Sequence, residues 1–388
     1  MNLPPLSLHH LHCLTDATGI IQHARLSIPD RHSGYTGDDN SRALVLAVHL
    51  QALRPRAPAD QLLRTYVAFL RSVQRPDGWF MNLAGDDPAN PDDLSEDCFG
   101  RCVWACAEVV QCETAPPAMR DTGRAMLQAA LPHAWRLQTI RGCANALLGA
   151  ALLPDAGDVT AYLADRLVAA YGRSADREWR WFEPILTYDL GRMPQALFRA
   201  ARRLRDARYH EVAEATLAFL LQVQTADGVF APIGSKGWYA RGGERAIWDQ
   251  QSLEAGALAE ACIDAYAVTH HAGYIDLARW AFDWYLGGNM LRIPLHDPAT
   301  GRCFDALTPG RPNLNCGAES LLSYLLAYTA LRGVEGLAIW RRGAPLFART
   351  GSGVRIPSPP PDQSPRGFQP FSSTIIEMNF IDVRLRRC

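Results

Sequence analysis

The chain has 388 residues, 48% of them hydrophobic, and its 39 basic residues are balanced by 40 acidic ones. A net charge of −1 leaves no basic stripe for a phosphate backbone, so we expect no nucleic-acid partner. No apolar run reaches the roughly 18 residues of a membrane span, and the start lacks the regions of a signal peptide. These features predict a cytoplasmic globular protein that has no membrane partner.

Residues 1–30 are predicted to form an N-terminal segment that precedes the folded domain. His9, His10, His12 and Cys13 lie close together in this segment, which resembles a metal site in composition. Nothing in their spacing sets a ligand geometry, so we expect these residues to be solvated.

Residues 31–348 alternate between two kinds of predicted helix. Apolar segments rich in alanine and leucine follow polar clusters and begin near Ser41, Glu96, Ile140, Gly191, Asp249 and Cys316. Between them, residues 61–74, 119–133, 159–171, 209–224 and 274–286 carry apolar residues at i, i+3, i+4 and i+7, which is typical of a helix with one wet face. Inner helices that alternate with outer ones predict an all-α fold, the (α/α)6 toroid.

The chain also repeats itself at a fixed offset. FLRSVQRPDGWF at 69–80 returns as FLLQVQTADGVF at 219–230, which is 150 residues later, and Asp39 with Arg42 returns as Asp189 with Arg192. Such a period indicates equivalent stacked units. We therefore predict a pseudo-two-fold ring with three helix hairpins in each half.

We expect neither a metal nor another cofactor. The ten cysteines include no pair spaced Cys-x-x-Cys, and no glycine-rich phosphate loop occurs. Cys98, Cys102 and Cys106 share one helix face, where small side chains suit helix packing better than metal binding.

Residues 349–388 are predicted to be a disordered tail. Their first part is rich in glycine, serine and proline (TGSGVRIPSPPPDQSPRG from Thr350), and it cannot bury enough apolar surface to offset the entropy of ordering.

Polar side chains should gather at one end of the ring, because parallel inner helices bring all their N-termini together there. Carboxylates, amides, arginines and loop aromatics at this funnel favour a carbohydrate site. The predicted substrate-binding residues are Tyr35, Asp38, Asp39, Asn40, Arg42, Trp79, Arg101, Trp181, Tyr188, Asp189, Arg192, Trp238, Trp248, Gln250 and Glu319. For several of them a structural role is an open alternative, such as helix capping by Asp38 or an i, i+3 ion pair between Asp189 and Arg192.

The predicted catalytic residues are Glu96, Asp97, Asp249 and Glu254. Inverting glycosyl transfer needs two carboxyl groups about 6 to 10 Å apart, one as acid and one as base. The second and fifth hairpins, which carry these residues, lie three units apart in a six-unit ring. They should therefore face each other across its axis. Capping is an open alternative for Asp97, whereas Glu254 lies too deep in its helix to cap it.

Several blocks resemble the signature of a bacterial six-hairpin glycosidase-like family, whose members are (α/α)6 toroids associated with glycosyltransferases. The blocks are GYTGDDNSRAL at 34–44, SED at 95–97 with Gly100 and Arg101, WFEPILTYD at 181–189, GGER at 242–245 with DQQ at 249–251, and GAES at 317–320. The resemblance spans about residues 30–332 and implies a glycan or oligosaccharide substrate and a glycosyltransferase as a candidate partner. The chain departs from the family pattern at Phe99, Leu190 and Cys316, where His, Asn and Gln are common.

The favoured function is an inverting glycoside hydrolase, or a phosphorylase, that acts on oligosaccharides. A glycan-binding or scaffold module without catalysis is the main alternative, because fold does not imply function. A terpenoid-cyclase or prenyltransferase-like toroid is a third reading, since the Val-Gln-x-x-Asp-Gly-x-Phe turns resemble turns of those enzymes. The sequence lacks both the Asp-x-Asp-Asp run of a cyclase and the zinc ligands of a prenyltransferase.

Overall fold

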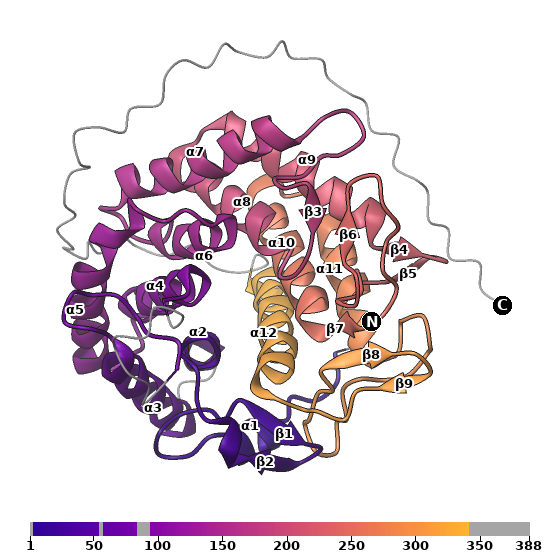
Figure 1. Ribbon diagram of the computed structural model, residues 1–388. Helices are drawn as coiled ribbons and strands as arrows, with labels where there is room; N and C mark the ends of the chain where they lie inside the picture. The colour runs from indigo at the N-terminus through magenta and orange to yellow at the C-terminus, as the bar shows by residue number, and fades with distance from the viewer. Residues whose placement is uncertain (1–2, 54–56, 84–93, 341–388) are drawn as a thin grey trace. The chain divides into compact units, whose positions relative to one another are not determined.

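The computed structural model describes residues 3–53, 57–83 and 94–340, all within one compact unit, Met1–Ile356. Within this unit, inner helices pack in chain order and the last returns to the first, which closes a ring (Figure 1). They are α2 (Gly37–Leu53), α4 (Glu96–Gln111), α6 (Ile140–Ala150), α8 (Arg192–Leu204), α10 (Ser252–Thr269) and α12 (Ala318–Trp340). The predicted (α/α)6 toroid is confirmed.

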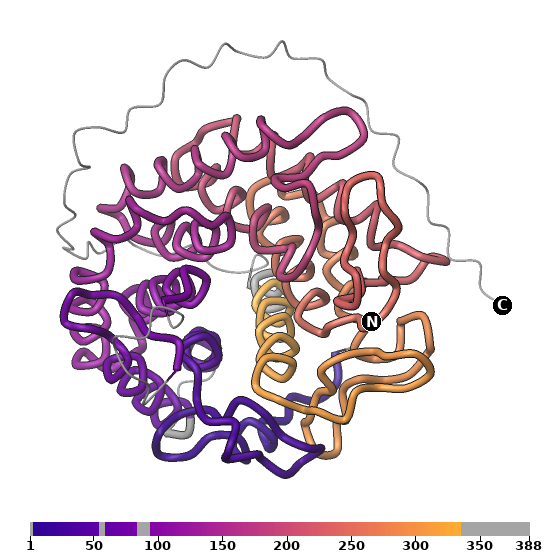
Figure 2. The backbone as a smooth tube through the Cα atoms, in the orientation of Figure 1, coloured from indigo at the N-terminus to yellow at the C-terminus, as the bar shows by residue number. Residues whose placement is uncertain are grey.

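Outer helices cover the inner ring, as the backbone trace in Figure 2 also shows. They are α3 (Ala57–Val73), α5 (Pro117–Ala134), α7 (Gly157–Ser174), α9 (Ala207–Val223) and α11 (Gly273–Asp283). Both ends of α3 and α9 are 150 residues apart, and each helix leads into a turn whose Asp-Gly pair includes a residue with positive φ. The sequence repeat is therefore present as equivalent hairpins.

The inner helices are largely buried, and most of them are rich in small apolar residues. Residues 43–47 of α2 are completely enclosed. Helices α4 and α6 approach closely at Gly100 and Gly142, where a Cβ on Gly100 would lie 2.5 Å from the Gly142 carbonyl oxygen. A larger residue there would push the two helices apart, and with them the side chains at their N-termini.

The N-terminal segment packs against the ring. Helix α1 (His9–Leu14) contacts α12, and strands β1 (His23–Arg25) and β2 (Ile28–Asp30) form an antiparallel pair that leads into the short helix η1 (Arg31–Ser33). His10 is buried, and its Nε2 lies 2.9 Å from the Cys316 carbonyl oxygen. The expectation of solvated residues is wrong for His10, because Leu11 and Leu14 on the same short helix anchor it in the core.

Short strands lie in the segments that join the helices, several of them just before an inner helix. They are β3 (Ile185–Leu186), which pairs with β6 (Tyr239–Ala240), β4 (Thr225–Ala226) with β5 (Val229–Phe230), and β7 (Gln250–Gln251), β8 (Ala306–Thr308) and β9 (Arg311–Pro312) in one sheet. The helix η3 (Trp284–Leu286) follows α11.

The predicted tail, residues 349–388, lies outside the described residues. Within the described part of the chain, no helix combines the length and the apolar character that crossing a bilayer requires.

Candidate active site in the funnel

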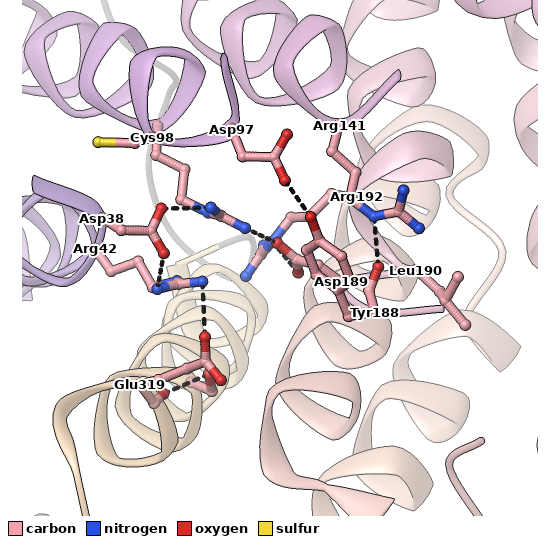
Figure 3. Close-up of polar contacts among 12 residues, drawn as sticks. Asp38, Arg42, Asp97, Cys98, Arg141, Tyr188, Asp189, Leu190, Arg192 and Glu319 are labelled. Carbon is pink, nitrogen blue, oxygen red and sulfur yellow. Dashed lines mark hydrogen bonds and ion pairs between the residues drawn. The ribbon is translucent and has the colours of Figure 1, made fainter. Parts of the chain in front are cut away.

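A network of ion pairs occupies the N-terminal ends of the inner helices (Figure 3). Arg42 on α2 donates to Asp38 over 2.7 Å and to Glu319 on α12 over 3.2 Å. Arg101 on α4 also donates to Asp38, and its other terminal nitrogen lies 2.6 Å from Asp189, just before α8. The side chains of these two arginines thus join four segments around the ring.

The network continues on the far side of Asp189. Arg192 on α8 lies 3.2 Å from Asp189 and 2.7 Å from Glu260 on α10, with its guanidinium 5.2 Å from the ring of Trp104. Both arginine and carboxylate are almost completely enclosed at each of these contacts. A buried charge without a partner costs several kcal/mol, so each member depends on the others.

The equivalent acids Asp39 and Asp189 differ in pKa. Burial raises the pKa of Asp39 to about 7, and the opposing effect of Arg42 is too small to prevent it. Burial acts on Asp189 in the same direction, but Arg192 and Arg101 outweigh it and lower its pKa to about 2. At neutral pH, Asp189 is ionised and Asp39 is divided between its two forms.

Two of the predicted catalytic acids bind backbone amides of a neighbouring hairpin. Glu254, which is 1% exposed, accepts hydrogen bonds from the N–H groups of Asp189 and Leu190, the latter over 3.2 Å. Burial and nearby Asp189 raise the pKa of Glu254 to about 8. Glu96 accepts from the N–H groups of Gln138 and Thr139, at 2.8 and 2.6 Å. These contacts hold the segments that lead into α8 and α6.

Asp97 has a different environment. Its carboxylate accepts from the Tyr188 hydroxyl over 2.7 Å and from the Thr139 hydroxyl over 3.4 Å. Tyr188 is 37% exposed, with the Arg141 guanidinium 4.4 Å from its ring centroid and the Trp238 ring 6.4 Å away. Asp97 is itself partly exposed, so this carboxylate and two aromatic rings lie together at an accessible surface.

Asp249, just before β7, is another partly exposed acid of the predicted catalytic set. Its side chain is 18% exposed, and one oxygen lies 3.2 Å from the Lys236 ammonium. The other oxygen, Oδ1, is buried and has no hydrogen-bond partner among the described residues. A buried carboxylate oxygen without a donor is unusual, because such atoms are nearly always satisfied.

The remaining predicted residues divide by exposure. Those at least partly exposed are Tyr35, Asp38, Trp79, Trp238, Trp248 and Glu319. Those buried are Asn40, Arg42, Arg101, Trp181, Arg192 and Gln250. Asn40 and Gln250 both accept internal hydrogen bonds, from the Ile20 amide over 2.9 Å and from the Trp284 indole over 3.2 Å. Trp181 is completely enclosed, so its ring offers no face to a sugar in this conformation.

Two residues that form ion pairs with predicted site residues were not themselves predicted. Lys236, the partner of Asp249, is the only lysine of the chain, which is a signal of codon usage rather than of function. Glu260, the partner of Arg192, lies inside the apolar helix α10, which is the position expected from the sequence for Glu254. That expectation is wrong for Glu254, because α10 begins at Ser252 and Glu254 lies in its first turn. Among the described residues, no cluster of three or more histidines, cysteines and acids is arranged to bind a metal.

A cavity of about 690 Å³ adjoins Asp249 and Lys236. Its other walls come from β1 and from the segment that includes β8, β9 and Asn315. The cavity is large enough for a monosaccharide unit, since pockets for small ligands start at about 300 Å³.

Known structures of sugar-processing enzymes are similar to this fold. A GH76 α-mannanase from Bacteroides thetaiotaomicron aligns with a TM-score of 0.60 and 13% identity, over 86% of this chain and 95% of that one. Cellobiose 2-epimerase from Bacillus thermoamylovorans aligns with a TM-score of 0.62 and 13% identity, over 85% of this chain and 96% of that one. A sugar epimerase from a ruminal bacterium aligns with a TM-score of 0.64 and 10% identity, over 87% of this chain and 97% of that one. Identities this low show the fold alone.

Comparisons of sequence add nothing to this picture. No protein-family model matches the chain, and no curated protein matches it.

Proposed function

We propose that the chain is a carbohydrate-active enzyme, an inverting glycoside hydrolase or phosphorylase, that uses Asp97 and Asp249 as its acid–base pair. The observation that carries this proposal is their position. The two acids belong to opposite hairpins of the ring, both are partly exposed, and neither is bound to backbone amides as Glu96 and Glu254 are. The sugar enzymes of the same fold support a sugar as the substrate.

The surrounding residues take supporting roles in this proposal. Tyr188 orients the Asp97 carboxylate through its hydroxyl, and its ring forms a stacking surface with Trp238. Trp248, which is also partly exposed, is a separate candidate for stacking. Asp38 and Glu319 are accessible enough to accept hydrogen bonds from sugar hydroxyls. Glu96 and Glu254 position the segments before α6 and α8, so they act through other residues and do not touch the substrate.

The test is a screen of α- and β-linked oligosaccharides, with and without phosphate, in which NMR follows the anomer formed. General acid or base catalysis contributes about 10² to 10⁴ in rate, so Asp97→Asn and Asp249→Asn should each lower kcat by that factor. Asp121→Asn, at an exposed site on the outer helix α5, is the matched control and should keep full activity.

The outcomes separate the alternatives. Full activity in both funnel variants would remove the acid–base pair, and retention of anomeric configuration would remove the inverting mechanism. A C2-epimerised product would assign the site to sugar epimerisation. Glycan binding without turnover in the wild type would favour the non-catalytic module.

The proposal places the enzyme in the cytoplasm, with a glycosyltransferase as a candidate partner on the strength of the sequence resemblance. Co-purification of the full chain with a tagged glycosyltransferase from the same genome tests the partnership. Separate elution of the two proteins would contradict it.

A further inference from the structure

The cavity beside Asp249 is rich in charged side chains. Its lining includes the basic residues Arg25, Lys236 and Arg311 and the acidic residues Asp30 and Asp249. Arg25 belongs to β1 and Arg311 to β9, and these segments are joined because the Leu26 amide donates to the Leu314 carbonyl over 3.0 Å. Both guanidinium groups therefore come from neighbouring backbone segments.

The two arginines differ from those of the funnel network. Neither the Arg25 nor the Arg311 guanidinium has an ion pair or hydrogen bond to the described residues, whereas Arg42, Arg101 and Arg192 each bind two or more partners. Lys236 already pairs with Asp249. The cavity thus offers two guanidinium groups whose hydrogen-bond donors are available to a ligand.

Asp249 supplies the complementary acceptor. Its Oδ1 atom is buried without a donor, while the other carboxylate oxygen faces Lys236. The accessible part of the carboxylate, beside Lys236, can accept a hydrogen bond from a hydroxyl group of a ligand. The cavity therefore suits a molecule that carries an anionic oxygen group and a neighbouring hydroxyl.

We propose that this cavity binds the carboxylate of an acidic sugar residue, with Arg25 and Arg311 on the carboxylate and Asp249 on a ring hydroxyl. Guanidinium groups match carboxylates through paired, charge-assisted hydrogen bonds, which a neutral sugar cannot form. This inference rests on the proposed function, because Asp249 serves both the cavity and the acid–base pair. It makes the substrate a uronic-acid-containing glycan.

The test is isothermal titration of the full chain with matched sugars, glucuronic against glucose and galacturonic against galactose. At least one uronic acid should bind about tenfold more tightly than its neutral counterpart, a difference of about 1.4 kcal/mol in binding free energy. Added salt should weaken the binding of the uronic acid but not that of the neutral sugar. The double variant Arg25→Gln, Arg311→Gln should lose about that factor. Arg71→Gln, at an exposed position on α3, is the control and should bind as the wild type does.

Three results would overturn the proposal. These are equal binding of acidic and neutral sugars, unchanged binding in the double variant with a native circular dichroism spectrum, and competition by inorganic phosphate at an affinity equal to that of the uronate. The same titration with the Asp97→Asn variant separates this proposal from the proposed function. Asp97 does not line the cavity, so this variant should bind uronate as the wild type does. If turnover is never found but the variant still binds uronate, only the proposed reaction fails.

Discussion

Asp39 with Arg42 at the start of α2, and Asp189 with Arg192 at the start of α8, are the same motif 150 residues apart. Each acid lies next to the arginine three residues later, at 3.4 Å in the first half and 3.2 Å in the second. Even so, burial takes the pKa of Asp39 to about 7, while that of Asp189 is lowered to about 2. The Asp–Arg pair is thus present in both halves, but the charged residues around it differ.

Part of the difference originates in another helix of the ring. Asp189 has a second guanidinium, Arg101 of α4, which reaches it across the funnel. The helix that corresponds to α4 in the second half is α10, and it contains no basic residue (SLEAGALAEACIDAYAVT). Asp39 instead has the acidic neighbours Asp38 and Glu319, which raise its pKa further. The charge of one motif is thus decided by a residue elsewhere in the ring.

Removal of Arg101 should reduce this difference, and it has the largest expected effect on stability. Arg101→Gln leaves both Asp38 and Asp189 with one guanidinium each, so the free energy of unfolding should fall by about 5 kcal/mol, at the upper end for a broken buried ion pair. Urea denaturation measures it. Arg124→Gln, which removes an exposed i, i+3 pair on α5, should cost less than about 1 kcal/mol. Equal losses in the two variants would contradict the central role of Arg101.

The paired variants Asp189→Asn and Asp39→Asn test the comparison directly. At pH 6, Asp189→Asn should lower the free energy of unfolding by about 3 kcal/mol, because Arg101 and Arg192 lose a charged partner. Asp39→Asn should cost less than about 1 kcal/mol, since Asp39 is mostly protonated at this pH. The reverse order of the two losses would refute the assignment of charge.

The ring itself could be predicted from the sequence, whereas this assignment of charge could not. Alternation of apolar and amphipathic segments predicts the hairpins, and the repeat predicts that α3 and α9 are equivalent, because both signals are patterns of residue type along the chain. The contact between Arg101 and Asp189 joins residues 88 positions apart, and Glu254 binds the Leu190 amide 64 positions away. Such partners depend on how far each helix projects into the funnel, which no local pattern encodes.

The accessibility of the predicted aromatic rings also could not be predicted from local sequence patterns. A tryptophan in a loop has the same sequence signature whether its ring faces a ligand or the core. Trp181 packs against Phe182 with ring centroids 5.0 Å apart and is enclosed, while Trp238 lies beside exposed Tyr188. Which ring is accessible follows from the loop conformation, and this depends on contacts such as the close approach of Gly234 to the Trp248 backbone.

The two acids should also give opposite pH dependences. The folded pKa of Asp39 is raised from 3.8 to about 7, so its contribution to stability is full below pH 3.8 and is lost as the pH rises through 7. That of Asp189 is lowered from 3.8 to about 2, so its contribution is present above pH 3.8 and is lost as the pH falls through 2.

Differences between the wild type and each variant isolate these effects from other titrating groups. From pH 5 to pH 7, the advantage of the wild type over Asp39→Asn should shrink by about 2 kcal/mol, since one pKa unit corresponds to about 1.4 kcal/mol. Over the same range, the advantage over Asp189→Asn should stay constant, and it should shrink only below pH 4. If the two stability differences changed with pH in the same way, Asp39 and Asp189 would titrate alike and the assignment of charge would be wrong.

The smallest expected effect concerns how each half holds the start of its inner helix. In the first half Thr36 does this locally, since its hydroxyl accepts from the Asp39 amide over 3.0 Å and donates to the Asp39 carboxylate over 2.8 Å. In the second half Glu254 binds the Asp189 and Leu190 amides from another helix. Thr36→Val should lower the free energy of unfolding by about 1 kcal/mol, the usual cost of a lost N-terminal cap, and Thr36→Ser should restore it. Because the hydroxyl donates to the ionised form of Asp39, the loss should be greater at pH 8 than at pH 6, and thermal melts at both values measure it. A loss independent of pH would mean that Thr36 caps α2 without sensing the charge of Asp39.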